Sequence, residues 1–308
     1  MVILALLLIP LIWGYNWVVM KQALRFCGPF EFAAWRYLLG SIVLFGAMAL
    51  GKRSFRIRPA GAVVVVGLLQ IAANTGLTMW ALLLGSAGRT AILTYTTPLW
   101  VVLFGWPLLR ERPTREKWLA LITSGVGVGL IFLSTIGRSR LDAVILATLS
   151  GCSQAGGTIL ARKLLDRYQV DVLALTAWQI LVGGLALSVA AFLVPGRPTH
   201  WTPYLGFAMF YEAVPATAFA FWLWYSLLQR VEAGIATLAS LATPAIGILL
   251  TALWLHERPR GTEALGMALI FASLVIVGPI ALRQARNGRA QATTASSPGG
   301  DGKELHAV

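Results

Sequence analysis

Residues 87–113 read AGRTAILTYTTPLWVVLFGWPLLRERP, and residues 233–259 read AGIATLASLATPAIGILLTALWLHERP. When the two stretches are aligned from end to end, nine of the 27 positions are identical. Both keep a Thr-Pro pair in the middle and end on Glu-Arg-Pro. Two such motifs at one fixed spacing indicate an internal duplication, which limits the folds that the whole chain can adopt.

The chain around this repeat is unusually apolar. Of its 308 residues, 57% are hydrophobic and 12% are charged, and the mean hydropathy is +0.75. Soluble domains carry about 25% charged residues, so the composition predicts a polytopic membrane protein. The net charge of +13 does not indicate a nucleic-acid partner, because the basic residues fall in short runs between apolar stretches, as they do in cytoplasmic loops of membrane proteins.

The apolar stretches are long enough to cross a bilayer, which takes about 20 residues in a helix. We therefore expect an all-α protein with ten transmembrane helices. The expected spans are 2–23, 30–50, 60–84, 87–109, 117–136, 142–163, 170–194, 204–228, 233–255 and 263–282.

Basic residues set the expected orientation. If the N-terminus is cytoplasmic, 16 of the 25 Lys and Arg residues fall in cytoplasmic segments, in line with the positive-inside rule. We therefore predict a multi-pass protein of a bacterial inner membrane with both termini in the cytoplasm. The polar segment 283–308 is expected to be a disordered cytoplasmic tail.

The repeat period contains five spans, which is an odd number, so the second copy must cross the membrane in the opposite direction. We predict two inverted five-helix repeats at residues 1–137 and 138–282. The Glu-Arg-Pro at 111–113 would then lie inside and that at 257–259 outside. Inverted repeats are typical of secondary transporters, with the substrate near mid-membrane. A channel or membrane enzyme with an old duplication is the alternative.

Several motifs resemble a known family. Trp13-Gly14-Tyr15-Asn16-Trp17, Lys21, Pro29 and Arg36 resemble the start of an EamA repeat, and Thr97-Pro98-Leu99 with Glu111-Arg112-Pro113-Thr114 and the glycine-rich span ending near Ser134 resemble its later part. This resemblance implies the drug/metabolite transporter superfamily, with ten helices in two inverted EamA repeats.

The overall layout is most similar to aromatic amino acid exporters of the YddG type. In the second repeat, Gly156-Gly157-Thr158 replaces the tryptophan-flanked motif. The binding residues of the two repeats are therefore not expected to be symmetric.

Polar side chains within the spans are the candidates for substrate binding, because they are unfavourable in lipid unless they face the bundle interior. Gln70, Asn74 and Thr78 share one helix face, and Ser150, Gln154 and Thr158 share another. The alternative is that these groups only hold helices together. The predicted substrate-binding residues are Asn16, Trp17, Gln70, Asn74, Thr78, Tyr95, Thr97, Gln154 and Ser240.

Prolines and charges complete the expected site. Pro98 and Pro244 remove helix hydrogen bonds at equivalent points of the two repeats and are predicted gating positions. Glu212 is the one carboxylate placed well inside a span, and it is a possible proton site; a helix-end position is the alternative. Arg36 and Arg89 lie near span ends, from which they are expected to reach the interface.

No motif of an enzyme, a phosphate-binding loop or a metal cluster is found, so we expect no catalytic activity, cofactor or metal. The prediction is a carrier that exports small metabolites, amino acids including aromatic ones, by alternating access through a midplane cavity. The alternative is a proton-coupled exporter of cationic drugs that uses Glu212. The expected partners are a small-molecule substrate and the lipid bilayer, and the oligomeric state stays open, with a monomer possible.

Overall fold

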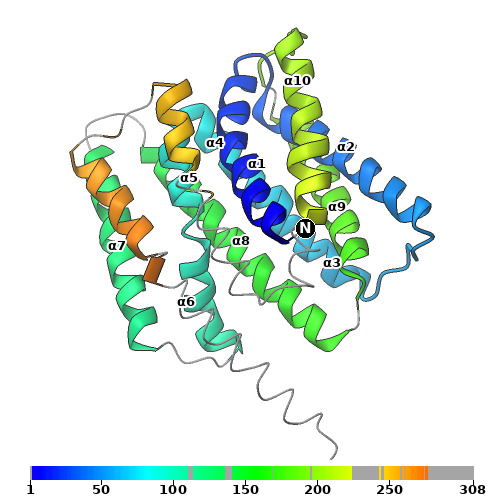
Figure 1. The fold of residues 1–308 in the computed structure, drawn as a ribbon, viewed down its shortest axis with the longest axis horizontal. Coiled ribbons are helices and arrows are strands. Elements are labelled where there is room, and N and C mark those ends of the chain that lie inside the picture. The colour runs from blue at the N-terminus through cyan, green and yellow to red at the C-terminus, as the bar shows by residue number, and fades with distance from the viewer. Residues whose placement is uncertain are drawn as a thin grey trace, which may run out of the picture.

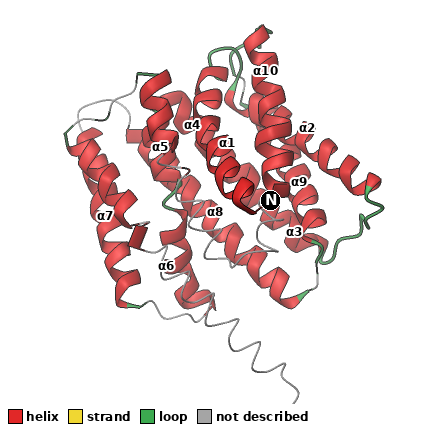
Figure 2. Ribbon diagram, in the orientation of Figure 1, coloured by secondary structure: helices red, strands yellow, loops and turns green. Residues whose placement is uncertain are grey.

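The computed structural model describes residues 2–109, 114–135, 141–168, 170–194, 196–223, 243, 246–256, 259, 261–273 and 275–276. Within these residues the regular structure is entirely helical, and the helices pack side by side as a bundle (Figures 1 and 2). The predicted tail at 283–308, both Glu-Arg pairs, Ser240 and Pro244 lie outside the described residues.

Eight helical segments make up the first half of the chain: α1 (Val2–Ala23), α2 (Pro29–Leu50), α3 (Ala60–Gly67), the π-helical η1 (Leu68–Ala73), α4 (Asn74–Leu84), α5 (Ala87–Thr94), α6 (Thr97–Leu109) and α7 (Arg115–Thr135). The second half contains α8 (Leu141–Arg167), α9 (Val172–Leu193), α10 (Pro203–Tyr211), the π-helical η2 (Glu212–Phe219), a helix at 246–254 and a helix at Thr262–Ser273.

Seven described segments are long and apolar enough to cross a membrane, judged by length and composition. They coincide with the second to eighth expected spans, and α1 covers the first. The described parts of the ninth and tenth spans are helical. The prediction of an all-helical, polytopic membrane protein is confirmed, and the count of ten spans stays a prediction.

The two π-helical segments lie at equivalent places in the two halves. η1 begins at Leu68 and η2 at Glu212, and each interrupts the third helix of its half. A π-helical turn holds an extra residue and changes which side chains face a neighbouring helix. The duplication therefore preserves a local backbone irregularity as well as sequence motifs.

Loop contacts show how the halves are oriented. In the loop after α1, the Phe26 carbonyl accepts a hydrogen bond from His200 N (2.8 Å), which lies in the loop between α9 and α10. The loop before α9 is the second-half equivalent of the loop after α1, and its Asp171 pairs with Arg53, just beyond α2 (3.1 Å). Because α2 runs from the first loop to Arg53, equivalent loops lie at opposite ends of the bundle. An inverted repeat produces this arrangement.

The halves also interleave. α1 and α2 of the first half pack against α10 and η2 of the second, α8 and α9 pack against α3, η1 and α4, and α2 packs against α9 where the two sets meet. We call the first set the α1 group and the second the α8 group. Gly14 of α1 approaches Ile246 so closely that an added Cβ would lie 2.6 Å from its Cγ2, which brings the helix 246–254 into the α1 group.

The inverted arrangement predicts which residues share a membrane side. Single cysteines at Arg53 and Asp171 should react with an impermeant maleimide from one side, and a cysteine at His200 from the other. All three positions are exposed. Labelling of D171C and H200C from the same side would contradict the fold.

Cys27 provides a low background for that measurement. Its side chain is buried, and burial, helped by the negative charge of Glu31 and opposed by Arg197, raises the pKa of the thiol to about 12. A raised pKa keeps the thiol protonated at pH 7–8, and the thiolate is the reactive form. In a Cys152→Ala background, Cys27 should therefore label slowly.

Candidate functional site

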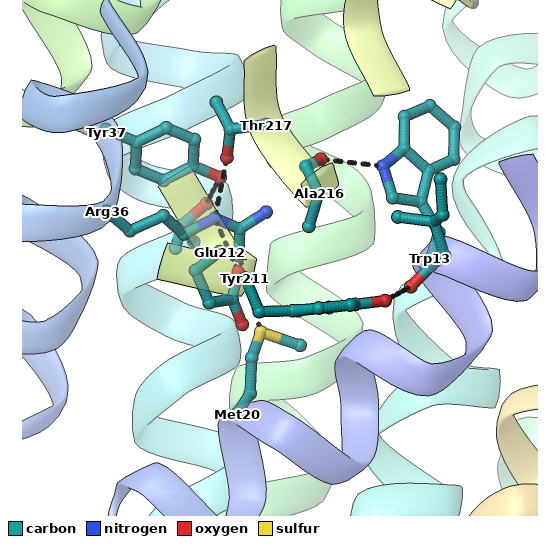
Figure 3. A network of polar contacts seen from close by, with 10 residues as sticks. Trp13, Met20, Arg36, Tyr37, Tyr211, Glu212, Ala216 and Thr217 are labelled. Atoms are coloured by element: carbon teal, nitrogen blue, oxygen red, sulfur yellow. Dashed lines mark hydrogen bonds and ion pairs between the residues drawn. The ribbon is translucent and has the colours of Figure 1, made fainter. Parts of the chain in front are cut away.

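A buried ion pair joins the two halves within the α1 group. The Arg36 side chain of α2 reaches Glu212, the first residue of η2, with Nε 2.9 Å from Oε2 (Figure 3). The side chains are 8% and 0% exposed. Glu212 directly follows α10 and lies near the middle of the membrane-length segment Pro203–Leu223 rather than at a helix end, and its role as a proton site stays a prediction.

Other polar groups complete the surroundings of the pair. Arg36 Nε also donates to Thr217 Oγ1 (3.1 Å), and Nη1 lies 3.5 Å from Met20 Sδ. With its amide nitrogen turned toward the carboxylate, Asn16 donates to both oxygens of Glu212 at 2.9 and 3.0 Å. Buried charges are tolerated when they are paired and hydrogen-bonded, and here three helices supply the partners.

Aromatic side chains fix α1 against the same region. Tyr211 Oη donates to the carbonyl of Ile12 (2.7 Å), and Trp13 Nε1 donates to the carbonyl of Ala216 inside η2 (3.0 Å; Figure 3). Tyr15 contacts Tyr211 edge-on, with 5.5 Å between ring centroids. These contacts hold Asn16 opposite the carboxylate.

The expectation that Arg36 reaches the interface is wrong. Arg36 is only 6% exposed. Because α2 begins at Pro29, Arg36 lies two turns inside the span, where its charge is attracted by Glu212. The sequence feature that could have predicted this pairing is the isolated carboxylate of Glu212, because a charge within a span requires a partner from another span.

The α8 group contains a neutral counterpart of this cluster. When the two halves are aligned with Asn16 on Thr158, Gln70 falls on Glu212, and Gln70 Nε2 donates to Thr158 Oγ1 (3.0 Å). When the second half is shifted by one more residue, Arg36 aligns with Gln179, which is also buried (2% exposed). The contact of Asn16 with Glu212 thus has an uncharged equivalent in that of Thr158 with Gln70.

The predicted polar faces of the third and sixth spans contact each other. Asn74 Nδ2 donates to the Ser150 carbonyl (3.0 Å), and the Ser150 hydroxyl lies 3.0 Å from that of Thr94. Gly157 permits the approach, since an added Cβ would overlap Gln70 Cγ. These groups therefore join helices, and a substrate role for them stays a prediction.

The fourth span is interrupted where the sequence predicts a gate. α5 ends at Thr94 and α6 begins at Thr97. Pro98 lacks the N–H that would bond the Thr94 carbonyl in a continuous helix. The Thr97 hydroxyl donates to that carbonyl (2.9 Å) and also lies within reach of the Gly151 carbonyl (3.2 Å). The threonine thus satisfies the group that the proline leaves open.

Four more of the predicted binding residues are a pair of aromatic residues and two residues with unpartnered polar atoms. The Tyr95 ring lies 6.3 Å from that of Trp17, across the contact between α1 and α5. Thr78 Oγ1 and Gln154 Oε1 are buried with no hydrogen-bond partner among the described residues. Buried polar atoms without partners are unfavourable, so a ligand that bonds them would be stabilised.

Membrane-length helices in two interleaved, oppositely oriented halves, with interrupted helices that carry polar groups, define a multi-pass membrane protein of the transporter class. Sequence comparison identifies the family. The EamA-like transporter family matches residues 1–133 and 141–278, and the chain belongs to that family. A transporter of this family implies a small-molecule substrate and a surrounding lipid bilayer.

Relatives of similar length are known. The chain is 24% identical to the uncharacterized transporter YoaV of Bacillus subtilis, over 87% of this chain and 94% of that protein. It is 26% identical to protein PecM of Dickeya dadantii (89% and 91%), and 25% identical to a probable amino-acid metabolite efflux pump of Escherichia coli (88% and 92%). A crystal structure with 19% identity has a TM-score of 0.64 over 91% of this chain and 97% of that one, which shows a shared fold.

The buried ion pair predicts non-additive stability changes. Arg36→Met leaves an uncompensated carboxylate and should lower the free energy of unfolding by about 3–5 kcal/mol. In R36M/E212Q the oxygen of the new amide still accepts a hydrogen bond from Asn16. The double variant should therefore recover at least half of the stability lost in Arg36→Met. Unfolding titrations in mild detergent measure both values, and additive losses would show that the pair does not interact.

Proposed function

We propose that the protein is a secondary transporter that exports small metabolites, amino acids including aromatic ones among them, by alternating access. It acts as ten transmembrane helices in two inverted five-helix repeats, residues 1–137 and 138–282, around a midplane cavity. It resides in a bacterial inner membrane with both termini in the cytoplasm, and the segment after 282 forms a cytoplasmic tail.

The observation that carries this proposal is the interleaving of the halves. The α1 group and the α8 group each combine helices of both halves, and the alignment of one half on the other exchanges the two groups. If the groups rock against each other, one end of the bundle closes as the other opens. The resulting conformation interchanges the roles of the two halves and therefore has packing similar to that of the first conformation. Two inversely related states of comparable energy are what alternating access requires.

Four of the predicted binding residues favour a net-neutral, amphipathic substrate. Trp17 and Tyr95 supply aromatic faces, and Thr78 and Gln154 supply polar atoms without partners among the described residues. Amides and hydroxyls can bond both an ammonium and a carboxylate, and aromatic faces accept apolar side chains. We keep Pro98 and Pro244 as gating positions and the remaining predicted residues as substrate contacts.

Counterflow tests the proposal. Proteoliposomes loaded with unlabelled phenylalanine should accumulate labelled phenylalanine transiently, and Tyr95→Ala should raise the half-saturating concentration about two- to tenfold, because an aromatic contact contributes about 0.5–1.5 kcal/mol. Tyr168→Ala removes a tyrosine that is 40% exposed and serves as the matched control. Absence of saturable counterflow for every amino acid tested would refute the substrate class.

The burial of Glu212 favours one alternative, a proton-coupled exporter of cationic drugs that uses this carboxylate. In that case Glu212→Gln should abolish export of a cation such as ethidium driven by a pH gradient. In an amino acid exporter, R36Q/E212Q should retain phenylalanine counterflow if it folds. Arg36 already occupies the position of a cation beside Glu212, which supports the amino acid proposal.

A further inference from the structure

A second ion pair lines a cavity at the end of the bundle that carries the loop after α1. The cavity has a volume of about 190 Å³ and is lined by residues from the start of α5, the helix 246–254 and the helix Thr262–Ser273. Its lining includes Ser86, Arg89, Ile248, Thr251, Glu263 and Met267. Both halves of the chain contribute, which places the cavity at a junction between them.

The geometry of this pair differs from that of Arg36 and Glu212. Arg89 Nη1 lies 3.5 Å from Glu263 Oε1, and the side chains are 13% and 24% exposed. Nitrogen–oxygen hydrogen bonds are normally about 2.7–3.2 Å long, so the two charges are apposed but not closely bonded. Both are partly hydrated, and a ligand that carries the two opposite charges could enter between them without leaving either unpaired.

The remaining lining suits the rest of such a ligand. The Thr251 hydroxyl donates to the Ile248 carbonyl (3.0 Å), so its oxygen is oriented to accept from an ammonium group. Ile248 and Met267 provide apolar surface for a side chain. Gly88 allows α5 to approach here, because an added Cβ would lie 3.0 Å from Thr251 Oγ1.

The sequence positions that correspond to Arg89 and Glu263 in the other half do not hold an acid–base pair. The alignment of 87–113 with 233–259 places Arg89 on Ile235. When it is extended beyond residue 113, the same alignment places Lys117 on Glu263. The inverted counterpart therefore has one positive charge and no carboxylate at these positions. The duplication therefore does not repeat the charged residues that line this cavity.

We propose that this cavity is a binding site for zwitterionic α-amino acids at the mouth of the transporter, distinct from the midplane site. Arg89 binds the α-carboxylate, and Glu263 and Thr251 bind the ammonium group. The proposal rests on the proposed function for its ligand, and the proposed orientation makes this the outer mouth, where an exported amino acid is held before release.

The test compares the two sides of oriented proteoliposomes. In Arg89→Gln and in Glu263→Gln, the half-saturating concentration of phenylalanine on the α5 side should rise at least tenfold, while that on the opposite side stays unchanged. Phenylalanine should compete from the α5 side, whereas phenylalaninamide and 3-phenylpropionate, which each lack one charge, should compete at least tenfold more weakly. The R53Q/D171N variant, which neutralises the exposed pair at the opposite end, should behave as wild type.

Each failure has its own signature. Normal counterflow with unchanged half-saturation in both variants, or a change in maximal rate alone, would overturn the site and leave the proposed function intact. If wild type shows no amino acid counterflow, the proposed function fails, and calorimetry with phenylalanine on the detergent-solubilised protein decides the site. Binding that R89Q and E263Q weaken would support it, and equal or absent binding in all three proteins would overturn it.

Discussion

A carboxylate placed inside an apolar bundle constrains everything around it. Glu212 is fully buried, and a charge in that position requires a cation and further donors within hydrogen-bonding distance. Arg36 and Asn16 satisfy this requirement from two helices of the other half, so α1 and α2 must pack against η2. This one interaction therefore couples the halves and sets which faces of α1, α2 and η2 meet.

The backbone follows a second constraint, that every polar group in lipid be satisfied within the protein. At the interruption of the fourth span, the Thr97 hydroxyl replaces the N–H that Pro98 lacks. At η2, Trp13 of α1 bonds a carbonyl of the π-helical segment. Interrupted helices are thus stable because side chains from the same or neighbouring helices bond their carbonyls.

Much of the fold could be predicted from the sequence, because continuous apolar runs and a duplication are properties of the chain itself. The spans from 30–50 to 204–228 and the buried position of Glu212 follow from these features. The partner of Glu212 could not be predicted in the same way. Arg36 belongs to the other half of the chain, and pairing it with Glu212 requires the interleaving of the halves, which depends on packing rather than on hydropathy. The π-helical segments were missed for a related reason, since they keep the apolar character of the helices they interrupt.

For the polar residues of the third and sixth spans, the same side chains would serve either to hydrogen-bond a neighbouring helix or to bind a substrate. Sequence alone therefore cannot separate a structural role from a binding role.

Comparison of the two halves separates what the duplication retained from what it changed. Both retain the π-helical segment and a polar contact from the first helix of one half to the third helix of the other. The charges differ, because Glu212 and Arg36 correspond to Gln70 and Gln179, and the Arg89–Glu263 pair corresponds to Ile235 and Lys117. In the proposed alternating-access cycle, this shared backbone would give the two states similar packing. The substitutions at charged positions make the two ends of the bundle unequal, and an exporter of the kind proposed would need such an inequality to have a direction.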